Sequence, residues 1–152
     1  MNILILSAST GGGHMRASKA IEGYMTQQNK DINVKIVDSL LYISPILNKT
    51  ITSGYVYLAT KTPKLYGKLY DLTNKEHRLA NFVTRLNNIF ANKLLPLIDD
   101  FRPDVIITTH PFPTEMVSRL KLKGEINIPL ICIMTDYAPH KAWISEKVDA
   151  YI

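Results

Sequence analysis

The feature of this chain that most constrains its fold is a series of short apolar runs, each of which ends in polar residues. The first run, Ile3–Leu6, leads through a few small residues into three consecutive glycines. Similar segments are Val34–Val37, Asp104–Thr109 and Leu130–Met134, and a fifth begins at Val148. Continuous, β-branched runs are typical of strands that are covered on both faces, as in a parallel sheet.

Helical patterns lie between these strands. We expect helices over Met15–Gln28, Thr114–Leu122 and a long stretch, Glu76–Phe101, whose apolar residues recur at helical spacing. Residues 40–73 contain two prolines and are expected to form two or three short helices joined by loops. Alternating strands and helices predict the α/β class, with a Rossmann-like, doubly wound parallel sheet. The 152 residues fit a single domain, 1–152.

Right-handed crossovers bring the carboxyl ends of all parallel strands to one edge of the sheet, which is where such folds bind ligands. Polar and proton-active residues follow the strands at these ends. They are Gly11–His14, Asp38, His110–Thr114 and Thr135–Asp136. The sequence therefore predicts a ligand site at this edge.

The glycine loop favours an anion. Without side chains, Gly11, Gly12 and Gly13 let the backbone approach a ligand, and the following helix offers unpaired N–H groups and a partial positive charge. His14 lies at the rim of this loop and can exchange a proton near neutral pH. The alternative is a tight turn with a solvated histidine.

A second polar cluster follows the strand that ends at Met134. Asp136 and His140 can together handle the proton of a hydroxyl, and the indole of Trp143 can pack on a sugar or an acyl chain. The alternative is that Asp136 caps a turn, His140 is solvated and Trp143 fills a gap under the loop.

A third cluster is the stiff segment from His110 to Thr114. Two prolines, one of them Pro113, fix the direction of Phe112, and Thr114 is expected to cap the following helix. The alternative is a rigid connection that binds nothing.

Positive charge is concentrated in residues 49–93, which hold eight basic and two acidic side chains within a chain of net charge +5. Tyrosines among these lysines suit reversible docking on an anionic membrane surface. The residues expected there are Tyr55, Tyr57, Lys61, Lys64, Tyr66 and Lys68. A solvated helical face packed by tyrosines is the alternative, and nucleic acid is disfavoured because no recognised binding motif accompanies the aromatic residues.

Several other classes are disfavoured. The chain has no Gly-Lys-Ser/Thr phosphate loop, and Arg16 stands where the third glycine of the dinucleotide fingerprint belongs. Asp38 can mimic the ribose-binding acid, so an NAD(P) domain stays as an alternative. No metal-ligand spacing stands out, and we expect neither a metal nor a cofactor. Cys132, the single cysteine, reads as a buried small hydrophobe. The sequence shows neither a signal peptide nor an apolar run long enough to span a membrane.

Three motifs in this order resemble the N-terminal half of monogalactosyldiacylglycerol synthases and the related bacterial diacylglycerol glucosyltransferases. They are Gly11–His14 with Ala17 and Ser18, then Thr109–Pro113, then Thr135–Asp136 followed by His140 and Trp143. The resemblance implies a GT-B glycosyltransferase with two Rossmann-like domains. This chain would be the domain that takes the lipid acceptor and touches the membrane. A C-terminal domain, absent from this sequence, would hold most of the UDP-sugar, in agreement with a strand that has only just begun, at Val148, when the sequence ends at Ile152.

The implied reaction is inverting transfer of glucose or galactose from UDP-glucose or UDP-galactose to diacylglycerol, at the inner, cytoplasmic face of the cell membrane. His14 is implied as the base, with Asp136 as runner-up or acceptor-orienting residue. The three glycines would face the diphosphate. His110, Phe112, Pro113, His140 and Trp143 would line the acceptor pocket. A transferase acting on a lipid-linked peptidoglycan precursor, and a stand-alone module that binds anionic lipid, are the alternatives. The choice between the two sugars stays open.

Overall fold

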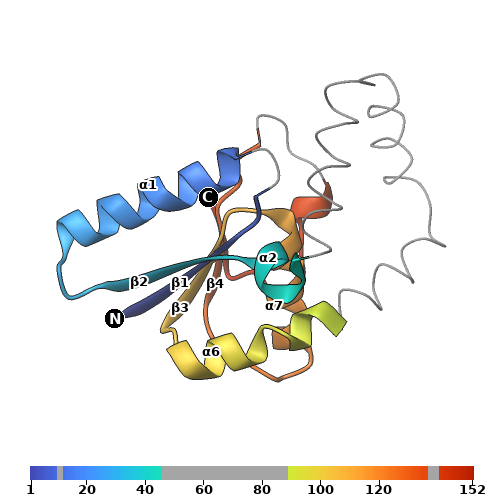
Figure 1. The fold of residues 1–152 in the computed structure, drawn as a ribbon. Helices are drawn as coiled ribbons and strands as arrows, with labels where there is room; N and C mark the ends of the chain where they lie inside the picture. Colours follow the sequence, from blue (N-terminus) through green and yellow to red (C-terminus); the bar gives the residue numbers. More distant parts are fainter. Residues whose placement is uncertain (10–11, 46–88, 137–140) are drawn as a thin grey trace, which may run out of the picture.

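The core of the molecule is a five-stranded, all-parallel sheet in the order β2-β1-β3-β4-β5. A computed structural model describes residues 1–9, 12–45, 89–136 and 141–152 (Figure 1). The strands are β1 (Asn2–Ser7), β2 (Asn33–Asp38), β3 (Val105–Thr108), β4 (Leu130–Cys132) and β5 (Ala150–Tyr151). All five predicted strands are therefore present, and the predicted Rossmann-like α/β class is confirmed.

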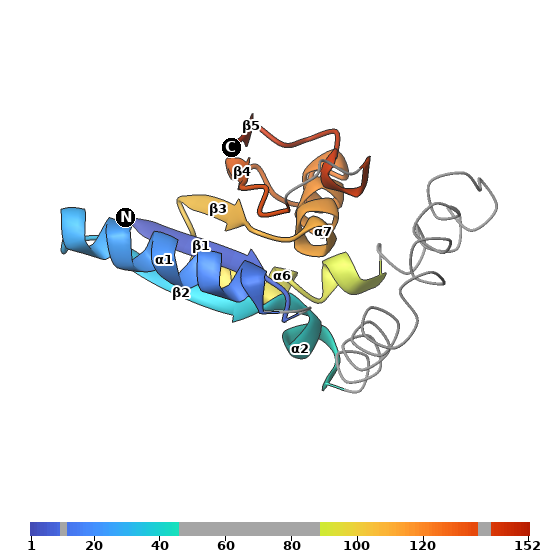
Figure 2. The same cartoon turned by 90° about the horizontal axis from the view of Figure 1, so that it is seen from above.

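Helices cover both faces of this sheet. They are α1 (Gly13–Gln28), α2 (Ser39–Ile43), α6 (Leu95–Phe101) and α7 (Pro111–Leu122), with a short 3-10 helix η1 (Lys141–Trp143). Figure 1 shows α1 on one side of the sheet and α6 on the other. Turned by 90°, the view in Figure 2 shows α1 lying along β1 and β2.

Alternate side chains of the strands build two apolar clusters, one on each face. Leu4 and Leu6 of β1 pack with Leu97 of α6 and Met116 of α7. Ile3 and Ile5 point the other way, where Ile21 and Met25 of α1 pack against them. Such two-sided burial explains why the strands read as continuous apolar runs rather than alternating ones. Cys132 is buried at the end of β4, as predicted, and burial raises the pKa of its thiol.

The strand order places a change of winding direction beside β1. From β1 the chain passes through α1 to β2 on one side, and β3, β4 and β5 then follow on the other side. Residue pairs such as Ile5–Ile36 and Ile5–Ile107 fix the register of β1 against both neighbours. In open α/β sheets, ligands bind outside the carboxyl ends of the strands at such a switch point. Here that point lies between the ends of β1 and β3.

The predicted long helix over residues 76–101 is wrong for the part that the structure describes. Residues 89–92 are helical, Lys93 and Leu94 form a turn, and α6 begins only at Leu95. Pro96 explains the break, since it has no N–H to donate to the carbonyl four residues earlier and its ring clashes with that group. The N–H groups of Lys93 and Leu94 instead donate three residues back, to Phe90 and Ala91.

The predicted start of the third helix is also corrected. Thr114 does not cap it, because α7 begins at Pro111 and its N-cap is His110. The side chain of Thr114 lies inside the first turn, where its Oγ1 is 2.9 Å from the His110 carbonyl oxygen and 2.8 Å from Thr108 Oγ1. Of the short helices expected within residues 40–73, α2 falls in the described part, and residues 46–73 lie outside it.

Candidate functional site

Three strand ends converge on one cluster of polar side chains. His14 is the second residue of α1, which follows β1, while Thr109 and His110 come directly after β3. Thr135 and Asp136 follow β4. The ring of His14 lies against residues from both other segments, so these three predicted clusters do form a single site at the carboxyl edge of the sheet. The site lies beside the switch point between β1 and β3.

The orientation of the His14 imidazole is set by two oxygens. Nδ1 lies 2.9 Å from the backbone carbonyl oxygen of Thr109 and 2.6 Å from Oγ1 of Thr135. Because a carbonyl oxygen only accepts, Nδ1 carries the hydrogen and donates it. In the neutral imidazole the lone pair is then on Nε2, so Nε2 is the nitrogen that can accept a proton.

Buried hydroxyls fix the first turn of α1 against the sheet. Thr109 Oγ1 lies 2.8 Å from Ser7 Oγ and 2.9 Å from Ser18 Oγ. Ser18 in turn donates to the carbonyl oxygen of His14 at 3.1 Å. Ser7, Ser18 and Thr109 are all fully buried. A satisfied buried network of this kind rigidifies its surroundings, and here it holds the backbone from which the His14 side chain projects.

His110 is a neutral partner for His14. Its Nδ1 accepts the N–H of Phe112 at 3.0 Å, which caps α7 and leaves the ring hydrogen on Nε2. Its ring meets that of His14 edge to face, with the centroids 4.6 Å apart. Burial first, and the charge of His14 second, lower the pKa of His110 to about 3. The two adjacent imidazoles thus differ: the lowered pKa keeps His110 neutral, whereas the contacts of His14 leave the lone pair of its neutral ring on Nε2.

Asp136 and Trp143 form a pair within the same cluster. The indole Nε1 of Trp143 donates to Oδ2 of Asp136 at 2.8 Å, and the indole lies 6.2 Å from the His14 ring between centroids. Trp143 is fully buried, whereas Asp136 is exposed. The indole therefore contacts His14 and Asp136 in this structure. Its role toward an acceptor stays a prediction, and so does the role of Asp136.

In the described part of the glycine loop, helix α1 begins without a side-chain cap. Gly12 is the N-cap of α1 with a positive φ of 79°, and no side chain caps the helix there. A Cβ built on Gly12 or Gly13 would meet nothing within 4 Å. The space beside both glycines is thus open. Gly11 lies outside the described residues.

Other predicted site residues belong to the frame of the site. Pro113 is buried, and Phe112 packs on the core cluster and tilts against Phe90 at 6.3 Å between ring centroids. Both carboxylate oxygens of Asp38 are engaged, by the N–H groups of Ser9 and Leu41. Asp38 thereby caps α2 and ties the loop after β1 to the end of β2.

Several predictions fall on residues that the structure does not describe. These are His140 and the six residues predicted to meet the membrane, namely Tyr55, Tyr57, Lys61, Lys64, Tyr66 and Lys68. Among the described ranges, no helix is long and apolar enough to cross a membrane. Within those same ranges, no group of three or more potential metal-ligating side chains is found.

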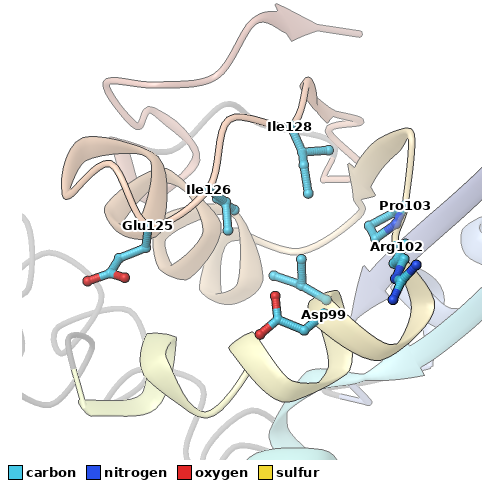
Figure 3. Close-up of a pocket in the computed structure, with 7 residues that line it drawn as sticks. Asp99, Arg102, Pro103, Glu125, Ile126 and Ile128 are labelled. Carbon is cyan, nitrogen blue, oxygen red and sulfur yellow. The ribbon is translucent and has the colours of Figure 1, made fainter.

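A separate hollow lies at the opposite, amino-terminal edge of the sheet. It has a volume of about 550 Å³ and is lined by Ile98, Ile126 and Ile128 together with the charged residues Asp99, Arg102 and Glu125 (Figure 3). Pro103 and Ile128, which also line it, precede β3 and β4. It is therefore far along the strands from His14, on the edge where α/β folds do not bind their main ligands.

Sequence reasoning missed the oxygens that hold His14. Thr109 and Thr135 stood inside the quoted motifs but received no role, and Ser7 received none either. One signal was available, since Ser18 lies four residues after His14 and thus on the same helical face. The contacts of Thr109 and Thr135 depend on the sheet order, which brings the ends of β1, β3 and β4 together.

Comparison with known proteins places this geometry in context. The family model described as monogalactosyldiacylglycerol (MGDG) synthase matches residues 14–152. The processive diacylglycerol beta-glucosyltransferase of Staphylococcus aureus (strain MRSA252) is 32% identical over 157 residues, covering 98% of this chain and 37% of that protein. The proteins of the same name from Bacillus thuringiensis (strain Al Hakam) and Bacillus cereus (strain B4264) are each 33% identical over 153 residues, with the same coverage. This chain thus spans little more than a third of the length of these relatives.

Proposed function

Because the chain belongs to the monogalactosyldiacylglycerol synthase family, we propose that it is the acceptor-binding domain of an inverting glycosyltransferase. The full protein transfers glucose or galactose from a UDP-sugar to diacylglycerol, and a further domain holds most of the donor. One observation carries the proposal: His14 lies at the switch point of the sheet with Nδ1 against the Thr109 carbonyl, which leaves the lone pair of the neutral ring on Nε2, as a general base requires.

The proposed step uses His14 as a general base. The glycerol hydroxyl of diacylglycerol attacks the anomeric carbon, and its proton passes to Nε2 of His14. The new bond joins the hydroxyl oxygen to the anomeric carbon as the bond from that carbon to the diphosphate oxygen breaks. UDP leaves with the electron pair, and attack from the opposite side inverts the configuration. The buried hydroxyls of Ser7, Ser18 and Thr109 support this role by fixing the backbone of His14.

The glycine loop is the proposed contact of this domain with the leaving diphosphate. Gly11, Gly12 and Gly13 precede or open α1, whose N-terminal N–H groups and dipole favour negative charge. Charge builds up on the diphosphate as the bond to the sugar breaks, and donors aimed at that charge lower the barrier. No metal and no cofactor is proposed for this step.

The acceptor is proposed to bind beside His14. His110 lines one side, with Phe112 and Pro113 behind it in the frame of the site, while His140 and Trp143 belong to the other. Asp136 orients the acceptor hydroxyl, or serves as the base if His14 does not. Support for this arrangement comes from the ring contacts of His14 with His110 and Trp143. The neutral state of His110 avoids a second positive charge next to the protonated His14.

The basic, tyrosine-containing region is proposed to dock the protein on anionic lipid at the cytoplasmic face of the cell membrane. Tyr55, Tyr57, Lys61, Lys64, Tyr66 and Lys68 are the residues assigned to this contact. Each lysine near an anionic surface contributes on the order of 1 kcal/mol, which suits reversible attachment. A lipid acceptor requires such contact, because diacylglycerol stays within the bilayer.

A transfer assay with the full-length protein tests this function. Labelled UDP-glucose and UDP-galactose are each supplied with vesicles that contain either diacylglycerol or a lipid-linked peptidoglycan precursor. The expected result is labelled glycosyl-diacylglycerol. With the peptidoglycan precursor, neither UDP-glucose nor UDP-galactose should give a labelled product. Transfer to the precursor alone would replace diacylglycerol as the acceptor. Vesicle binding without transfer from either donor would reduce the protein to a lipid-binding module.

A further inference from the structure

We infer that Thr135 is a positioning residue for His14: its hydroxyl holds the imidazole in the tautomer and orientation that present Nε2 to the acceptor. This inference rests on the proposed function and adds a residue to which neither the family match nor the names of the relatives assign a role. Thr135 lies after β4, whereas His14 lies after β1, so the contact spans three neighbouring strands of the sheet.

The first argument is the short distance. Thr135 Oγ1 lies 2.6 Å from Nδ1 of His14, closer than the carbonyl oxygen of Thr109 at 2.9 Å. Both groups are partly buried, which strengthens a hydrogen bond relative to one in water. The hydroxyl is thus the nearer of the two partners that Nδ1 has in the described structure.

The second argument is that the direction of the Thr135 hydroxyl is itself fixed. Its hydrogen points to the Thr109 carbonyl oxygen, 3.2 Å away. The hydroxyl therefore turns a lone pair toward Nδ1 and accepts its hydrogen, so that Nδ1–H lies between two acceptors. Rotating the ring by 180° would put a carbon in place of Nδ1 and lose both bonds, which locks the ring as well as the tautomer.

The third argument concerns the charge that forms during the reaction. When Nε2 takes the proton from the acceptor, the ring becomes an imidazolium and Nδ1–H becomes a charged donor. Hydrogen bonds from a charged donor are about twice as strong as neutral ones. The contact with Thr135 thus strengthens toward the transition state, and its loss should lower kcat rather than raise KM for the acceptor.

The wild-type protein supplies the first test without any substitution. Nitrogen-15 NMR of histidine-labelled full-length protein reports which ring nitrogen of His14 carries the hydrogen, with His14→Gln identifying the resonance. The expected signal in the neutral state is a lone pair on Nε2 and a hydrogen on Nδ1. A neutral His14 with its hydrogen on Nε2 would overturn the inference.

Two substitutions supply the second test. Thr135→Ala should lower kcat about tenfold, leave KM for diacylglycerol unchanged and give His14 a mixture of tautomers. Thr135→Ser keeps the hydroxyl and should restore both kcat and the single tautomer. The matched control is Thr26→Ala, because within the described residues the Thr26 hydroxyl contacts the Glu22 and Gly23 carbonyls of its own helix and no group of the site. That control should leave kcat and the His14 signal unchanged.

The outcomes separate this inference from the proposed function. A Thr135→Ala protein with wild-type kcat and an unchanged tautomer overturns the inference, and so does a loss of kcat that Thr135→Ser fails to restore. His14→Ala with wild-type turnover overturns the role of His14 as base, whatever the NMR signal shows. If Thr135→Ala does not fold, the tautomer of His14 in the wild-type protein and in Thr135→Ser still tests the role of Thr135.

Discussion

Acidification should destabilise this fold through His110, the partly buried histidine that caps α7. Its pKa is lowered to about 3, first by burial and then by the charge of His14. In the unfolded chain the same side chain has its ordinary value of about 6.5. Between these values the unfolded chain binds a proton at His110 that the folded chain does not. The stability associated with the neutral His110 is therefore fully present above about pH 6.5 and is lost progressively as the pH falls toward 3.

The size of this effect at about pH 5 follows from the two pKa values. There the unfolded side chain is mostly protonated and the folded one is neutral, which favours unfolding by about 2 kcal/mol relative to neutral pH. This free-energy change depends mainly on the ordinary pKa of 6.5 in the unfolded chain, because pH 5 lies well above the lowered pKa of His110 in the folded protein. A loss of 2 kcal/mol is a large fraction of the stability of an ordinary domain.

Urea unfolding of the chain and of His110→Asn, each at about pH 7.5 and about pH 5, measures this contribution. Asparagine does not titrate, yet its carbonyl oxygen can accept the Phe112 N–H and keep the cap of α7. The other histidines are present in both proteins, so their contributions cancel in the comparison, apart from the charge coupling between His14 and His110. The variant should lose about 2 kcal/mol less on acidification. Equal losses in the two proteins would refute the reasoning.

Two further predictions concern the glycine loop and the basic region. Gly12→Ala should cost about 1 kcal/mol in unfolding free energy, since a φ of 79° strains a residue with a Cβ even where space is open. Gly13→Ala, in the first turn of α1 with ordinary φ, is the matched control, and a loss as large there would contradict the argument from Gly12. Replacing Lys61, Lys64 and Lys68 together by glutamine should weaken binding to anionic vesicles by up to about 3 kcal/mol. Sedimentation with vesicles at low and high salt measures this, and binding that is insensitive to salt would rule out electrostatic docking.

The sheet could be predicted from sequence because its strands are buried on both faces. Ile3–Leu6 and its counterparts therefore carry a strong, local signal that tertiary packing does not override. The helix boundaries were less accessible. Pro96 stops the predicted long helix, and a histidine, a residue outside the usual N-cap types, caps α7 in place of Thr114.

The location of the candidate site could be predicted as far as the order of strands and helices could. Once the strands are parallel, His14, His110 and Asp136 must lie at one edge, and the structure confirms that the segments carrying them meet there. The contacts of Thr109 and Thr135 with His14 were not predictable. A threonine after a strand has no distinctive pattern, and its role depends on which strands become neighbours in the sheet.

The turnover of full-length His14→Ala tests the central claim most directly. Initial rates of sugar transfer to diacylglycerol in vesicles are compared with those of the unaltered protein, and vesicle binding is measured in parallel. If His14 accepts the hydroxyl proton, the substitution lowers turnover at least about 10²-fold while binding to the vesicles stays the same. Turnover equal to that of the unaltered protein would contradict the account.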